Sequence, residues 1–139
     1  MIVFNGKISK DGRWWAIAIP SLTIYTQGPT RTKAFFMIQD ALKLLVDQPG
    51  FKTKIIFKGK NIFQIAVNDE MAVFPLLLRQ QRSLSGKTLK QVAHTLGYKS
   101  LNGYAQYEQG RCQPTLAKAQ KFLSAINSRA ALSLNVVEL

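Results

Sequence analysis

The spacing of apolar residues changes character near residue 70, and this change constrains the fold more than any other feature of the chain. Before it, short runs of β-branched and aromatic residues are separated by turn signals and surround one amphipathic helical stretch. After it, apolar residues recur every three or four positions in short stretches that end at Gly or Pro, which is typical of a bundle of helices. We therefore predict an α+β chain of two domains, residues 1–68 and residues 69–139.

The first domain is predicted to be a small β-sheet with one helix packed on one face. Asp11-Gly12 is a hairpin signal between the first two strands. Thr30 can cap a helix whose apolar residues, up to Leu45, follow helical spacing, and Pro49-Gly50 ends that segment. The expected strands are residues 2–9, 14–19 and 24–27 before the helix, and one or two more within 54–57 and 61–67.

The second domain is predicted to contain four short helices and a C-terminal strand. Thr88 followed by Gln91 is a capping box, in which each residue satisfies an unpaired amide of the other. Ala131–Leu139 alternates apolar and polar residues, which predicts a strand that pairs with its counterpart in a second subunit. The expected helices are residues 76–82, 88–96, 101–108 and 115–126.

A large positive charge favours a polyanionic partner. The chain has 19 Lys and Arg against 7 Asp and Glu, a net charge of +12. Such a surplus attracts nucleic acid through phosphate contacts and counterion release. Both predicted domains are basic, and the second carries more of the surplus.

The sequence gives no sign of membrane insertion, secretion or metal binding. No apolar stretch approaches the roughly 20 residues that span a bilayer, and the N-terminus lacks the features of a secretory signal. A cytoplasmic location is therefore expected. Cys112 is the single cysteine and His94 the single histidine, so neither an intramolecular disulfide nor a zinc site is expected.

Two helices joined by a short Gly-containing turn can deliver the second helix into the major groove of DNA. The run from Tyr107 to Leu116 sharpens this reading, because it resembles the end of the recognition helix and the following turn in the phage-repressor-like (Xre-type) helix-turn-helix family. The positions that match the family's pattern are Arg79, Ala93, Gly97, Glu108, Gly110, Pro114 and Leu116.

This resemblance implies roles for individual residues. Arg79 and Glu108 would form a structural pair between the first helix and the recognition helix. The base-edge contacts would fall on Asn102 and Gln106, whose amides can pair bidentately with adenine. The phosphate contacts would come from Lys90, Lys99 and Ser100.

Three other residues of the recognition helix carry expectations of their own. Gly103 should weaken the helix by about 1 kcal/mol relative to alanine. Tyr104 and Tyr107 could stack on bases, but their spacing favours a place in the core.

The first half resembles the HicB antitoxin family. The matching residues, in order, are Asp11-Gly12, Ala18, Pro20, Thr26-Gln27-Gly28, Thr30 and Ala34. The resemblance implies a partial RNase H-like domain followed by a helix-turn-helix, with a small basic toxin ribonuclease bound by the first domain. Where the family usually has acidic residues, this chain has Pro29, Arg31, Thr32 and Lys33, and basic side chains would repel a basic toxin.

These observations lead to one principal expectation and two alternatives. The chain is expected to be the antitoxin of a HicAB-type toxin-antitoxin pair: a transcriptional repressor that binds operator DNA as a dimer or dimer of dimers and neutralises a small toxin. The alternatives are a general RNA- or DNA-binding module and an RNase H-like nuclease. Two-metal nuclease chemistry needs convergent carboxylates, whereas those of the first half lie at turns and on a helix. We therefore expect no catalytic residue, cofactor or metal.

Overall fold

The computed structural model describes residues 1–139, which divide into two compact units, Met1–Val73 and Phe74–Leu139. The division falls within helix α2 (Glu70–Leu84), a few residues after the predicted start of the second domain at residue 69. The chain is of the α+β class, as predicted. None of its helices has the length and apolar character needed to span a membrane.

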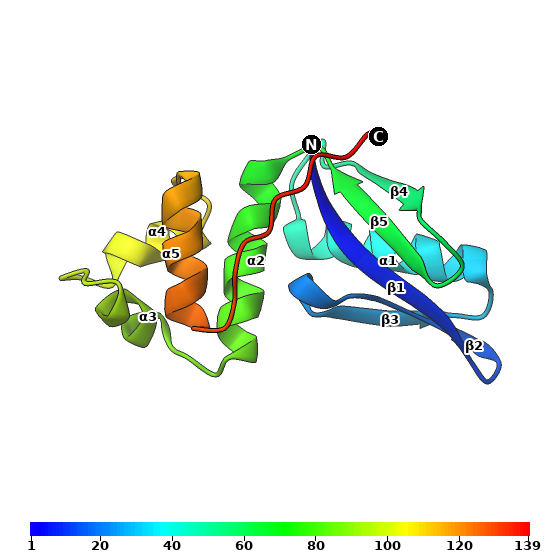
Figure 1. Cartoon of the computed structure of the whole chain (residues 1–139), viewed down its shortest axis with the longest axis horizontal. Helices are drawn as coiled ribbons and strands as arrows, with labels where there is room; N and C mark the ends of the chain where they lie inside the picture. The colour runs from blue at the N-terminus through cyan, green and yellow to red at the C-terminus, as the bar shows by residue number, and fades with distance from the viewer. The chain divides into compact units, whose positions relative to one another are not determined.

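Unit 1 is a five-stranded sheet with helix α1 across one face (Figure 1). The strand order is β3-β2-β1-β5-β4, and every neighbouring pair is antiparallel. Both candidate strands after the helix are present. The elements are β1 (Ile2–Asp11), β2 (Trp14–Ile19), the 3₁₀ helix η1 (Pro20–Leu22), β3 (Ile24–Gly28), α1 (Arg31–Val46), β4 (Thr53–Phe57) and β5 (Ile62–Val67).

The alternation of buried and exposed residues along the strands decides which face of the sheet α1 covers. Phe4 and Ile8 of β1 are buried while the residues next to them in sequence are more exposed, so one side of the strand faces the core. Helix α1 begins as predicted, because the side chain of Thr30 accepts a hydrogen bond from the Lys33 amide at 3.1 Å. Its buried residues are Ala34, Phe35, Ile38, Leu42 and Val46.

Unit 2 is built from helices around a single apolar core. Helix α2 is longer than the predicted 76–82 because Asp69 Oδ1 accepts a hydrogen bond from the Ala72 amide at 3.1 Å and caps an earlier start. The other helices are α3 (Leu89–Thr95), α4 (Asn102–Glu108) and α5 (Leu116–Ile126). The core residues are Leu78, Val92, Ala93, Tyr104, Tyr107, Phe122, Leu123, Ala125 and Ile126.

Residues 131–139 have no regular secondary structure in the single chain, so the strand expected to pair with a second subunit stays a prediction. An alternating segment becomes a strand only beside another strand that shares its hydrogen bonds, and the secondary structure of unit 2 is entirely helical. The start of the segment is instead held by α5, since the Leu132 amide donates to Gln120 Oε1 at 2.7 Å. Leu132 also packs against the core.

Candidate nucleic-acid interface

Helix α3 begins at the capping box that the sequence predicted. Thr88 Oγ1 accepts from the Gln91 amide at 3.1 Å, and Gln91 Oε1 accepts from the Thr88 amide at 2.9 Å. Two amides at the start of the helix are thereby satisfied without a ligand. The side chain of Lys90, in the first turn, remains exposed.

The turn between α3 and α4 depends on two glycines. Gly97 ends α3 with a φ of +80°, and the Tyr98 amide then donates back to the Ala93 carbonyl at 3.0 Å. Gly103, in the first turn of α4, lies directly against the ring of Tyr98: a Cβ at this position would be 2.4 Å from Tyr98 Cδ1. Gly103 is therefore required by packing, a role that its unfavourable helix propensity concealed.

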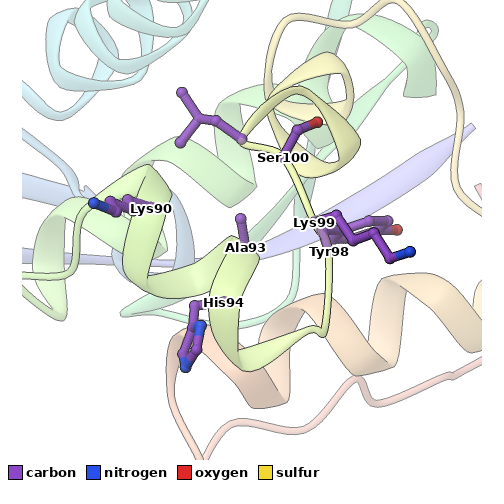
Figure 2. Close-up of a pocket in the computed structure, with 7 residues that line it drawn as sticks. Lys90, Ala93, His94, Tyr98, Lys99 and Ser100 are labelled. Atoms are coloured by element: carbon purple, nitrogen blue, oxygen red, sulfur yellow. The ribbon is translucent and has the colours of Figure 1, made fainter.

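A hollow of about 400 Å³ lies where α3, the turn and the start of α4 meet. It brings together all three predicted phosphate contacts, Lys90, Lys99 and Ser100 (Figure 2). The rest of its lining is Ala93, His94, Tyr98 and Leu101. Lys90 and Lys99 lie on opposite sides of Ala93 with their amino groups pointing away from each other, an arrangement that suits separate phosphates of a polymer better than one small anion.

His94 was not among the predicted site residues, yet it lines this hollow. The signal that could have found it is its spacing from Lys90, because residues four apart on a helix lie on the same face. Its exposed imidazole can donate a hydrogen bond to a phosphate oxygen.

The two predicted base-reading residues are placed differently. Asn102 is exposed at the first position of α4. Gln106 is half-buried, and its amide is engaged locally: Nε2 donates to the Gly103 carbonyl at 3.3 Å, and Oε1 accepts from the Cys112 thiol at 3.5 Å. The exposed side chain of Asn102 could contact a base edge without rearrangement, whereas the Gln106 amide would first have to break these hydrogen bonds.

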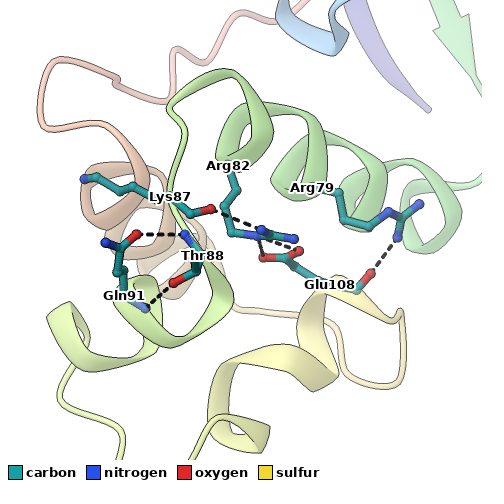
Figure 3. A network of polar contacts seen from close by, with 6 residues as sticks. All are labelled: Arg79, Arg82, Lys87, Thr88, Gln91 and Glu108. Carbon is teal, nitrogen blue, oxygen red and sulfur yellow. Dashed lines mark hydrogen bonds and ion pairs between the residues drawn. The ribbon is translucent and has the colours of Figure 1, made fainter.

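Glu108 fixes α4 to α2, but its ion-pair partner is not the predicted one (Figure 3). The carboxylate of Glu108, a residue that is only 3% exposed, accepts from Arg82 Nε at 3.1 and 2.9 Å. Arg79 instead donates to the main-chain carbonyl of Glu108 at 2.6 Å. Arg82 also donates to the Lys87 carbonyl at 3.1 Å, which links the same network to the loop before α3.

Tyr104 and Tyr107 lie in the core rather than on the surface. Their ring centroids are 5.3 and 4.8 Å from that of Phe122. Burial, and then the nearby Glu108 carboxylate, raise the pKa of Tyr104. These rings hold α4 against α5 and are not surfaces on which a base could stack.

Most of the positive charge of the chain is unneutralised. The ion pairs are the N-terminal amine with Glu70 at 3.2 Å and Arg82 with Glu108. The lysines of the hollow therefore have no carboxylate competing with a phosphate. No group of three or more His, Cys, Asp or Glu side chains is placed to hold a metal ion.

Comparison with known proteins gives no family for this chain: no protein-family model matches it, and no curated protein is significantly similar to it in sequence.

Proposed function

We propose that the chain is a DNA-binding transcriptional regulator that contacts its operator through α3 and α4. The observation that carries this proposal is the hollow between these helices, in which Lys90, Lys99 and Ser100 lie beside the exposed start of α4. The two lysines of the hollow would bind phosphates on either side of the major groove of the DNA. Asn102, at the start of α4, would then be the first side chain to reach a base edge.

The contacts that hold α4 in place support this assignment. A recognition helix must keep its side chains in register with the bases, and α4 spans only Asn102–Glu108. A helix this short is not stable alone. The Glu108 network and the packing of Tyr104 and Tyr107 on Phe122 provide the required support.

We further propose that the regulator is a HicB-type antitoxin that represses its own operon as a dimer in the cytoplasm and binds a small toxin through unit 1. Support for this comes from the residues of the first half that resemble that family and from the order of the elements, a small sheet with one helix followed by the helical unit. A dimer would place two copies of α4 about 34 Å apart, one turn of DNA, on an inverted repeat.

The test is binding of the full chain to the DNA upstream of its own gene and to a scrambled duplex. Asn102→Ala should weaken operator binding by about 1–3 kcal/mol and leave scrambled DNA almost unaffected. Lys99→Ala should weaken both duplexes alike and lower the salt slope by about one, because a phosphate contact carries no base information.

Two variants serve as matched controls. Gln109→Ala removes an exposed amide just after α4, and Lys121→Ala removes an exposed lysine from α5. Both should bind like the wild type. Equal loss on the two duplexes for Asn102→Ala would refute sequence reading by α4 and favour a general nucleic-acid-binding module.

A further inference from the structure

The positive charge of unit 1 is concentrated at one end of its sheet. The β1–β2 turn, the β3–α1 connection and the β4–β5 turn all lie at this end (Figure 1). Strand pairing brings them together, because Asp11 pairs with Trp14 at the first turn, Trp15 pairs with Gly28 at the end of β3, and the Ile8 amide donates to the Asn61 carbonyl at 3.0 Å. We call this region the basic end.

The basic end holds seven of the ten Lys and Arg residues of unit 1 but only one of its five acidic residues, Asp11. The seven are Lys7, Lys10, Arg13, Arg31, Lys33, Lys58 and Lys60. The remaining acidic residues lie along α1 or at the other end of the sheet, where Glu70 pairs with the N-terminal amine. The basic end therefore carries a net charge of +6, against +5 for unit 1 as a whole.

None of the seven basic side chains is in an ion pair. All are exposed except Arg31, which is half-buried and donates to the Lys60 carbonyl at 3.2 Å. Like charges held close together repel one another, and of these residues only Arg31 packs on the core, with its guanidinium 5.1 Å from the ring centroid of Phe35. Such a surface is stabilised by an anionic partner with several charges.

Two aromatic side chains are exposed at or beside the basic end. Trp14 is 45% exposed and follows Arg13 directly. Phe57 is 63% exposed, and the Arg31 guanidinium lies 5.7 Å from its ring centroid. Basic side chains interleaved with exposed rings are how proteins bind single-stranded nucleic acid, with phosphates on the cations and bases stacked on the rings.

We propose that the basic end of unit 1 is a second nucleic-acid site, which binds single strands without sequence preference and acts separately from α3 and α4. Its ligand is a phosphodiester backbone with unpaired bases, either RNA or DNA. The proposal does not depend on operator recognition by unit 2.

The experiment measures binding of the full chain to a labelled mixed-sequence single strand by fluorescence anisotropy over a range of salt concentrations. The variant Lys10→Gln/Arg13→Gln/Lys58→Gln removes three charges from the basic end. It should bind at least about tenfold more weakly, with a salt slope lower by about two, since each single-strand phosphate contact contributes about 0.7.

The matched control is Lys43→Gln/Lys52→Gln/Lys54→Gln, which removes the same charge from exposed residues outside the basic end. It should change single-strand affinity by less than about threefold. Equal losses in the two triple variants would mean that only net charge matters, and would overturn the proposal.

The variant Trp14→Ala distinguishes binding of single strands from binding of duplex. It should weaken single-strand binding by about tenfold through lost stacking and leave an unrelated duplex of the same length unaffected. No loss on the single strand, or the same loss on both, would overturn the proposal. Asn102→Ala should leave single-strand binding unchanged. The proposal for the basic end and the proposal of operator recognition by unit 2 can therefore fail independently of each other.

Discussion

Gly103 lies so close to Tyr98 that a methyl group added there would be 2.4 Å from Cδ1 of the ring. Helix propensity alone predicts that Gly103→Ala stabilises α4 by about 1 kcal/mol. The clash predicts the reverse, a loss of about 1–3 kcal/mol as the ring is displaced. Urea unfolding checks this, and in a Tyr98→Ala background the same substitution should cease to be harmful. A stabilising effect in the wild-type background would show that Tyr98 moves aside freely.

The hydroxyl of Tyr104 is buried without a hydrogen-bond partner, and burial raises its pKa. Tyr104→Phe should therefore change stability by less than about 1 kcal/mol at neutral pH. Because the folded state disfavours the phenolate, stability should fall as the pH rises above about 10, the pKa of an exposed tyrosine. The alkaline fall should be smaller in Tyr104→Phe than in the wild type, as measured by thermal unfolding across that range. An identical loss of stability in the wild type and in Tyr104→Phe would show that groups other than Tyr104 cause the alkaline loss.

At the scale of elements, the Arg82–Glu108 pair decides how α4 is held against α2. Arg82→Met would leave the Glu108 carboxylate, whose side chain is 4% exposed, without its counter-ion. We expect a loss of about 3 kcal/mol. Glu108→Gln should lower the free energy of unfolding by less than Arg82→Met does, because the Arg82 side chain is 22% exposed and can still reach water.

Chemical denaturation of the two single variants and the double variant Arg82→Met/Glu108→Gln measures this coupling. The double variant should lose less than the sum of the two single losses, because it leaves no buried charge unpaired. Arg79→Met is the comparison, since Arg79 binds only the Glu108 carbonyl and not its carboxylate. Strict additivity would show that the two side chains do not stabilise each other.

At the scale of the whole molecule, the carboxylates are dispersed. In unit 1, Asp11 lies at the β1–β2 turn, Asp47 follows the C-terminus of α1, and Asp69 and Glu70 follow β5. Two-metal hydrolysis needs carboxylates that converge on ions about 4 Å apart. We predict that the purified protein does not cleave RNA with magnesium or manganese. Cleavage that disappears in Asp11→Asn would establish a nuclease instead.

The sequence by itself determined most of the local structure of this protein. The strands and α1 of unit 1, the Thr30 cap, and the capping box of Thr88 and Gln91 were all predictable. Each depends on residues that are neighbours in sequence, so periodicity and capping chemistry are sufficient to find them.

Tertiary structure decided which distant side chains meet. Arg79 and Arg82 are both on α2, and the position of α4 decides that the Glu108 carboxylate forms its ion pair with Arg82 and not with Arg79. The contact of Tyr98 with Gly103 and the local bonds of Gln106 likewise depend on packing geometry that spacing does not encode. The C-terminal segment has an alternating pattern but no neighbouring strand. A pattern of side chains alone cannot form a strand, because the backbone N–H and C=O groups of a strand need hydrogen bonds to a neighbouring strand.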